Sequence, residues 1–407
     1  MGAHLVVQVA LVAFALDFTV DAQVFLVRQQ WLHDDPCAVA RPAGTPYAGP
    51  RRAASMDAPG AKVCSDIHIR APLRRLRYVR QRTEGGPPIP DARGMTSTIH
   101  DPDALLALGQ ALQGAGYRFV TVTPATHRRV NDRPGNARAR DLRGVFGWSR
   151  PFREDAVPGE ILALMRRAGV LRETKNGLCA TVRASTIGAR LYFHSAFPTR
   201  ADDAVFFGPD TYRYIAALQR SMETLAPPRR AVDIGAGSGA GAIEVACRFP
   251  GCESVGADIN DHALELTAVN ARLAGRTNVP TAHSDLLDGL DGGFDLVLSN
   301  PPYILDPAKL RYRHGGDMRG AGLSVSIVEA ALARLNPGGS LLLYTGIAIV
   351  DGRDEFLETV RPKLDARCAG WTYEELDPDI FGGQLDCEGY EDVERIAAVW
   401  LRATLAA

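Results

Sequence analysis

A chain of 407 residues is long enough for two ordinary domains, and its hydrophobic share of 46% with a charged share of 23% is typical of a globular protein. The formal net charge of -1 gives no global electrostatic reason to bind nucleic acid or an anionic membrane. The apolar run at residues 5–16 is shorter than the ~20 residues that a membrane-spanning helix needs, so we expect no membrane partner.

The seven cysteines are scattered along the chain, with no Cys-x-x-Cys pair and no histidine at metal-ligand spacing from two of them. An odd, scattered set is typical of free thiols in a reducing compartment. We therefore expect a cytoplasmic protein with no metal site.

Residues 1–95 differ from the rest of the chain. They are rich in proline, arginine and alanine, and they show no sustained hydrophobic period. Such a stretch is unlike one that buries a core of its own. We interpret it either as a low-order extension or as sequence ahead of a true start at Met95, outside the folded protein, and we assign it no chemistry.

Residues 96–203 predict a small domain. Asp101-Pro102 begins a helix and Pro158-Gly159 begins a second one, which stops at Gly169. Their inward faces should carry Leu105, Leu106, Leu108 and Leu112 in the first and Ile161, Leu162, Leu164 and Met165 in the second. Residues 179–195 predict a β-hairpin that turns at Ile187-Gly188. Helices followed by a hairpin indicate an α+β, winged-helix-like module for substrate recognition.

The stretch at residues 127–153 of this module is rich in arginine. Such a stretch can contact RNA or an acidic partner. It has aromatic residues at one end only, so we favour a solvated loop.

From residue 230 the chain alternates strand and helix patterns. We expect strands at 230–234, 254–257, 294–299 and 340–345, with helices at 241–249, 261–274 and 325–335. This alternation predicts a doubly wound α/β sheet, parallel and covered by crossover helices, in a catalytic domain over residues 204–407. The segment at 374–383 should pack as an extra element of that domain, and we assign it no chemical role.

The first of these strands leads into a glycine-rich turn. The turn reads Asp233-Ile234-Gly235-Ala236-Gly237-Ser238-Gly239. Glycines at alternate positions permit backbone angles that other residues avoid, and they let a ligand lie against bare backbone. Dinucleotide-binding folds also carry a glycine-rich turn, but their last two glycines lie three residues apart.

Acidic residues follow the next two strands. Asp258 stands at the end of the second strand, where a carboxylate can accept hydrogen bonds from ribose hydroxyls. Asp285 follows the third. With their neighbours Ile259 and Leu286, these residues are candidates to bind a ribonucleoside cofactor.

The fourth strand ends in Asn300-Pro301-Pro302-Tyr303. A planar nitrogen is a poor nucleophile because its lone pair is delocalised. The Asn300 side chain and the Pro301 carbonyl can accept hydrogen bonds from its two N–H groups and hold the lone pair toward an incoming methyl group. The prolines stiffen the backbone, and Tyr303 can stack on the flat group.

Together these motifs resemble the class I S-adenosylmethionine-dependent methyltransferases of the HemK/PrmC type, which methylate protein glutamine, and related small-domain enzymes that methylate guanine in RNA. The likeness covers about residues 204–345. It implies S-adenosylmethionine as cofactor, with the glycine turn near its methionine and ribose part and Asp285 near its adenine amino group. Two further stretches also resemble this family: residues 206–211, which include Asp210 and Thr211, and the glycines at 315–322. Gly208 and Tyr212 depart from the family pattern in the first of these.

We therefore expect an N-methyltransferase that uses residues 300–303 for catalysis. The cofactor-binding residues should be Asp210, Thr211, Asp233, Gly235, Ala236, Gly237, Gly239, Asp258, Ile259, Asp285, Leu286 and Asn300. The acceptor stays open between a protein glutamine or other planar amide, an RNA base (guanine N2 or adenine N6) and a small molecule of a biosynthetic pathway.

Overall fold

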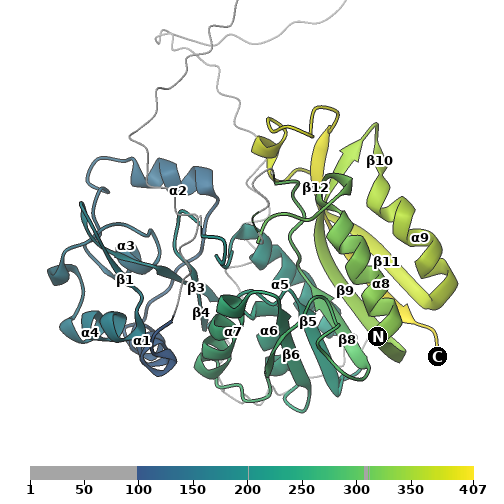
Figure 1. Cartoon of the computed structure of the whole chain (residues 1–407), viewed down its shortest axis with the longest axis horizontal. Helices are drawn as coiled ribbons and strands as arrows, with labels where there is room; N and C mark the ends of the chain where they lie inside the picture. The colour runs from purple at the N-terminus through teal and green to yellow at the C-terminus, as the bar shows by residue number, and fades with distance from the viewer. Residues whose placement is uncertain (1–98, 200, 307–309, 311) are drawn as a thin grey trace, which may run out of the picture. The chain divides into compact units, whose positions relative to one another are not determined.

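The computed structural model describes residues 99–199, 201–306, 310 and 312–407, which all belong to one compact unit over residues 85–407 (Figure 1). The apolar run at 5–16 and the expected extension at 1–95 lie outside the described residues. In the described part of the chain, no helix combines the length and apolarity needed to cross a membrane.

The amino-terminal part of the unit consists of helices followed by two short hairpins. The helices are α1 (Pro102–Gly114), α2 (Pro124–Asn131), α3 (Leu142–Phe146) and α4 (Gly159–Ala168), and a 3-10 turn, Glu154–Ala156, precedes α4. The hairpins pair β1 (Leu171–Thr174) with β2 (Gly177–Ala180), and β3 (Val182–Ile187) with β4 (Arg190–Ser195). The expected turn at Ile187-Gly188 is confirmed, but Cys179 belongs to the earlier hairpin.

Local signals set two of the helix ends that the sequence indicated, the start of α1 and the end of α4. The Asp101 carboxylate accepts a hydrogen bond from the Ala104 N–H at 2.9 Å and caps α1. Gly169 ends α4 with a φ of +74°, a left-handed angle that glycine adopts without strain. Most of the expected inward residues are buried, whereas Leu106 and Leu164 lie at the margins of their helix faces and are half-buried.

The catalytic part contains one large sheet with the order β11-β12-β9-β8-β5-β6-β7. The parallel strands are β5 (Arg230–Ile234), β6 (Glu253–Asp258), β7 (Thr281–His283), β8 (Phe294–Ser299) and β9 (Leu335–Val350). At one edge β12 (Arg395–Leu405) and β11 (Cys368–Asp377) run antiparallel to their neighbours, and a short β10 (Arg353–Asp354) also pairs with β9. The expected extra element at 374–383 thus begins as the end of β11.

Helices cover both faces of this sheet (Figure 1). One core packs α5 (Pro209–Met222) and α6 (Ala240–Arg248) on side chains such as Leu298 and Leu342. On the opposite face, α8 (Gly322–Arg334) and α9 (Glu355–Arg367) pack on strand side chains that include Val297 and Leu341. The doubly wound α/β fold that the sequence predicted is confirmed.

Helix α7 (Asp261–Leu273) joins the amino-terminal module to the sheet. Leu266, Val269 and Leu273 of α7 share a core with α1 and the hairpins. A Cβ on Gly109 of α1 would lie 2.7 Å from the Leu273 side chain, so this mid-helix glycine allows close packing. The boundary near residue 203 remains a prediction, because the two parts share this core.

A buried carboxylate reinforces the same junction. Glu244 of α6 accepts hydrogen bonds from Arg190 at 2.7 and 2.5 Å and from the Tyr192 hydroxyl at 2.9 Å, both on β4. The Gln219 amide of α5 donates to it as well, at 2.9 Å. A buried charge needs such partners, because leaving water is costly.

Glu244→Ala should lower the free energy of unfolding by about 3 kcal/mol. This lies at the low end for breaking a buried ion pair, because the Arg190 side chain is 31% exposed and water screens part of its charge. Urea denaturation measures the change. The matched control is Glu329→Ala, which removes a surface partner of Lys363 and should leave the midpoint unchanged. Equal effects of the two substitutions would contradict the assignment.

Candidate active site at the carboxyl edge of the sheet

The pairing of β5 with β8 defines the candidate site. These parallel strands are in register, with Ile234 opposite Ser299, and the Ser299 hydroxyl donates to the Ile234 carbonyl at 2.7 Å. The next residues of the two strands, Gly235 and Asn300, therefore leave the sheet at the same level. The strand order reverses between β5 and β8, the place where open α/β sheets bind ligands.

The turn after β5 has the backbone that its glycines predicted. Gly235, Gly237 and Gly239 have φ angles of +70°, +57° and +76°. A Cβ on Gly235 would meet no atom within 4 Å, so this backbone borders open space. A Cβ on Gly239 would lie 2.7 Å from the Thr267 side chain, so that glycine also allows α7 to approach. Ala236, between the first two glycines, is buried.

Asp258 at the end of β6 braces this turn. Its carboxylate accepts a hydrogen bond from the Gly237 N–H and another from the Asn260 N–H, each at 2.9 Å. Burial raises the pKa of this carboxyl. Beside it, Ile259 is 43% exposed, so its side chain offers apolar surface at this end of the sheet.

Asp233 lies beneath the turn. Its two carboxylate oxygens accept hydrogen bonds from the Ala242 N–H at 2.9 Å and from the Tyr214 hydroxyl at 3.3 Å. Burial raises the pKa of Asp233 to about 7. The structure thus bonds Asp233 to α6 and α5, and its expected contact with a cofactor remains a prediction.

The loop after β7 carries the other expected acidic residue. Asp285 is exposed, and its neighbour Leu286 has a φ of +49°, which is strained for a branched residue. The Ser284 hydroxyl stabilises the loop by donating to the Leu286 carbonyl at 3.0 Å and accepting from the Gly289 N–H at 3.0 Å. Because β7 pairs with β6, this loop lies one strand beyond Asp258 along the same sheet edge.

The tetrapeptide follows β8 directly. Asn300 is half-buried, and none of the residues that the structure describes hydrogen-bonds to its side chain. The glycine loop after it packs on its backbone. A Cβ on Gly315 would lie 2.7 Å from the Pro302 carbonyl oxygen, and one on Gly320 would lie 2.3 Å from the Tyr303 carbonyl oxygen. Only glycine fits against the tetrapeptide at these two positions.

Tyr303 and the start of α5 share a buried network that the sequence did not indicate. Asp210 accepts a hydrogen bond from the Tyr344 hydroxyl of β9 at 2.9 Å, pairs with Arg213 at 3.2 Å and interacts electrostatically with Tyr303. Arg213 also pairs with Asp377 of β11 at 2.8 Å. Burial raises the pKa values of both Asp210 and Tyr303. Asp210 therefore acts on Tyr303 of the tetrapeptide, and its expected contact with a cofactor remains a prediction.

Thr211, the other residue expected near the cofactor from this stretch, caps α5. Its hydroxyl accepts a hydrogen bond from the Gly208 N–H at 3.2 Å. The hydrogen bond fixes the first turn of the helix. A direct contact between Thr211 and a cofactor remains a prediction.

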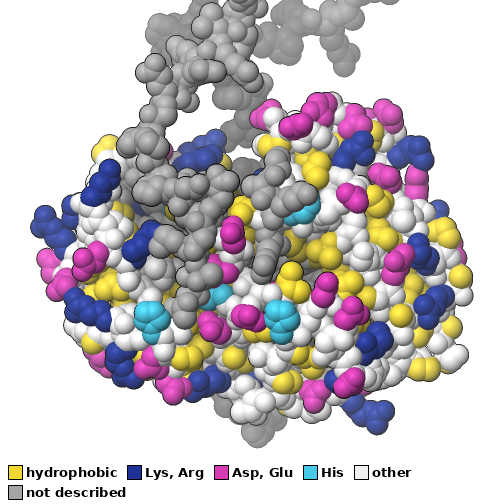
Figure 2. Space-filling model, viewed as in Figure 1, with side chains coloured by type: hydrophobic (Ala, Val, Ile, Leu, Met, Phe, Trp, Pro, Cys, Tyr) yellow, Lys and Arg dark blue, Asp and Glu magenta, His cyan; other side chains and the backbone are white. Residues whose placement is uncertain are grey.

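The face of the molecule in Figure 2 carries charges of both signs. On the face in Figure 2, the Lys and Arg side chains of the described residues are interspersed with Asp and Glu. In the segment 127–153, most arginines are exposed and Arg150 is half-buried, as a solvated surface would have them. The expected loop is wrong in part, because the end of α2 and the whole of α3 lie in this segment.

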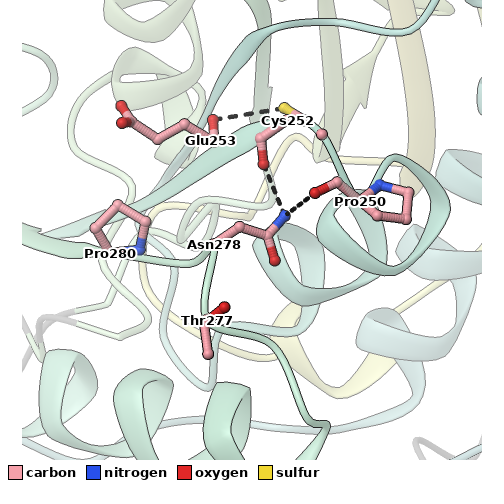
Figure 3. A pocket seen from close by; sticks show the side chains of 7 residues that line it. Pro250, Cys252, Glu253, Thr277, Asn278 and Pro280 are labelled. Atoms are coloured by element: carbon pink, nitrogen blue, oxygen red, sulfur yellow. Dashed lines mark hydrogen bonds between the residues drawn. The ribbon is translucent and has the colours of Figure 1, made fainter.

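A hollow of about 360 Å³ lies at the amino-terminal end of the parallel strands (Figure 3). It is lined by Pro250, Gly251, Cys252, Glu253, Thr277, Asn278 and Pro280. The Asn278 amide donates to the Pro250 and Cys252 carbonyls across it, at 3.3 and 2.7 Å. Because this hollow lies at the amino end of β6, it is remote from the carboxyl edge where the site residues gather.

Comparison with known proteins agrees with this geometry. Residues 215–347 match the family model described as "Methyltransferase small domain". The chain is 35% identical over 187 residues to a release factor glutamine methyltransferase of Deinococcus radiodurans, covering 43% of this chain and 62% of that protein. It is 32% identical over 145 residues to a ribosomal protein uL3 glutamine methyltransferase of Neisseria meningitidis, covering 33% and 46%.

The chain thus spans between about half and two thirds of the length of these curated relatives. Among solved structures, it resembles a tRNA m1G37 methyltransferase of M. jannaschii with a TM-score of 0.38 and 16% identity, over 56% of this chain and 57% of that one. The resemblance to small-domain methyltransferases that the sequence motifs predicted is confirmed.

The pKa of Asp233 predicts an unusual dependence of stability on pH. Its folded value of about 7 exceeds the ordinary 3.8, so between these values the unfolded chain ionises while the folded one keeps its proton. Raising the pH from about 4 to about 7 should therefore destabilise the wild type relative to Asp233→Asn, by about 3–4 kcal/mol at most, with little change above. Guanidinium unfolding of both proteins across this range measures the difference. A difference that stays constant or grows in favour of the wild type would refute the assignment.

Proposed function

We propose that the chain transfers a methyl group from S-adenosylmethionine to a planar nitrogen of a protein, with the side-chain amide of glutamine as the acceptor class. The observation that carries this proposal is the register of β5 and β8, which places the bare glycine turn beside Asn300 and Pro301. The names of the curated relatives, which act on glutamine of a release factor or of uL3, support the choice of acceptor.

The residues at the sheet edge fit the cofactor. Bare backbone at Gly235 leaves room for its methionine and ribose part, and Asp258 can accept hydrogen bonds from the ribose hydroxyls. The exposed Ile259 side chain offers an apolar surface to the adenine ring, with Asp285 and Leu286 on the next loop. When bound, S-adenosylmethionine supplies a methyl group on a sulfonium that needs no further activation.

The tetrapeptide supplies the acceptor chemistry. The Asn300 side-chain oxygen and the Pro301 carbonyl accept hydrogen bonds from the two N–H groups of the acceptor, so its lone pair turns toward the methyl carbon. The new N–C bond forms as the C–S bond breaks, and the nitrogen loses a proton to water. Catalysis rests on positioning and on exclusion of water. The close packing of Gly315 and Gly320 holds the backbone of Pro302 and Tyr303, the residues that directly follow the two acceptors.

We place this reaction in the cytoplasm and on a protein substrate. The five cysteines in the described part of the chain are free thiols, which suits a reducing compartment. The formal net charge of -1 supports a protein over an RNA acceptor, because RNA binding depends on a concentrated basic surface.

Asn300→Ala should reduce methyl transfer by at least about a hundredfold, the effect of losing one oriented acceptor at the reacting atom. The affinity for S-adenosylmethionine should stay within a few-fold of the wild type, as measured by calorimetry. Near-normal transfer by this variant would remove Asn300 from the mechanism.

Asp258→Ala should weaken S-adenosylmethionine binding by about tenfold or more, because it removes both the ribose acceptor and the brace on Gly237. Asp258→Asn, which keeps one oxygen for the Gly237 N–H, should bind better than the alanine variant. Calorimetry on the three proteins tests this order, and an unaltered dissociation constant for Asp258→Ala would show that the ribose lies elsewhere.

A further inference from the structure

The segment between β11 and β12, residues 378–394, lies against the loop that follows the tetrapeptide. At its start, the Ile380 N–H donates to the Ile396 carbonyl of β12 at 2.8 Å, and the Ile380 side chain is buried. A 3-10 turn, Gly382–Gln384, comes next. The segment is therefore anchored to the sheet at its base.

Its far side is bonded to the loop after Tyr303. The buried Gln384 amide accepts from Arg313 at 2.6 Å and donates to the Leu305 carbonyl at 3.4 Å. The buried Tyr390 hydroxyl accepts from the Leu305 N–H at 2.9 Å and donates to the Arg319 carbonyl at 3.1 Å. Four hydrogen bonds thus fix the segment beside the tetrapeptide.

Because the segment is fixed in this way, Phe381 lies next to Tyr303. Its side chain is 37% exposed, although Ile380 before it and Gln384 after it are buried. Its φ of +55° is a left-handed angle that a phenylalanine adopts only under constraint. Its ring meets the Tyr303 ring edge to face, with the centroids 5.9 Å apart. An exposed aromatic ring is held in a strained conformation at the proposed catalytic segment.

Tyr303 itself has little free surface. Its side chain is 8% exposed, and it interacts electrostatically with the buried Asp210. A Cβ on Gly346 would lie 2.4 Å from the Tyr303 ring, so this ring covers the bare backbone of β9 and packs near Tyr344. Tyr303 therefore contributes to the wall of the site, and the exposed aromatic surface beside the tetrapeptide is that of Phe381.

We propose that Phe381 lines the acceptor site and packs its ring against the planar nitrogen group that is methylated. This inference rests on the proposed function, whose acceptor it specifies further. A flat apolar ring covers a flat amide well and excludes water from the amide nitrogen. Asn300 and Pro301 meanwhile accept hydrogen bonds from the two N–H groups of that amide. The segment 378–394 is then a specificity element of the enzyme.

Three variants of the full chain separate recognition from folding. Phe381→Ala and Phe381→Gly both remove the ring, but glycine also relieves the left-handed backbone, so its melting temperature should exceed that of the alanine variant. Phe381→Tyr keeps the ring. Each protein is saturated with S-adenosylhomocysteine and titrated with N-acetylglutamine methyl ester by ligand-observed NMR. The apolar control ligand is N-acetylnorleucine methyl ester.

We expect the alanine and glycine variants to bind the glutamine ligand at least about tenfold more weakly than the wild type, despite their unequal stability, and the tyrosine variant to bind within about twofold. The norleucine ester should bind all four proteins poorly. Equal affinity of the wild type and Phe381→Ala for the glutamine ligand would overturn the inference, as would recovery of binding in Phe381→Gly or absence of binding to the wild type.

A methyl-transfer assay with purified uL3 and a release factor as substrates tests the proposed function separately from the role of Phe381. Wild-type protein that binds the glutamine ligand through Phe381 but labels neither protein would count against the proposed function while supporting the role of Phe381. Wild-type protein that labels one of them, with an unchanged KM in Phe381→Ala, would support the proposed function and overturn the role of Phe381.

Discussion

The parallel pairing of β5 with β8 is the constraint on which the site depends. Because Ile234 lies opposite Ser299, the glycine turn and the tetrapeptide leave the sheet side by side. The hydrogen bond from the Ser299 hydroxyl to the Ile234 carbonyl reinforces this register. A slip of one residue in this pairing would turn every side chain of β8 to the opposite face of the sheet. It would also move Asn300 away from the glycine turn.

The same site is tied to the amino-terminal module through one buried amide. Asn270 of α7 accepts from the Phe193 N–H at 2.8 Å and donates to the Phe193 carbonyl and to the Ser238 carbonyl, each at 2.9 Å. One side chain thus joins strand β4 to the glycine turn. The Glu244 carboxylate of α6 bonds to Arg190 and Tyr192 of the same strand, so these side chains fix the module to the sheet.

The sequence predicted the features that depend on neighbouring residues. Strands 230–234 and 294–299 were placed at their observed ends, because alternating apolar residues and the glycine and proline that follow are local signals. Strand β9 is longer than the expected 340–345, since β12 pairs along it as far as Ile349. The Asp210–Tyr344 hydrogen bond joins residues 134 positions apart, and the strained exposure of Phe381 depends on contacts of equally distant origin. No pattern of neighbouring residues in the sequence predicts such long-range contacts.

The central claim is that the site after β5 and β8 directs a methyl group onto a planar nitrogen of a protein. The most direct measurement is to incubate the protein with methyl-labelled S-adenosylmethionine and a bacterial extract, and to locate the label by tandem mass spectrometry. The account predicts label on the side-chain amide nitrogen of a protein glutamine. Label on an oxygen or carbon atom, or label confined to RNA or small molecules, would contradict it.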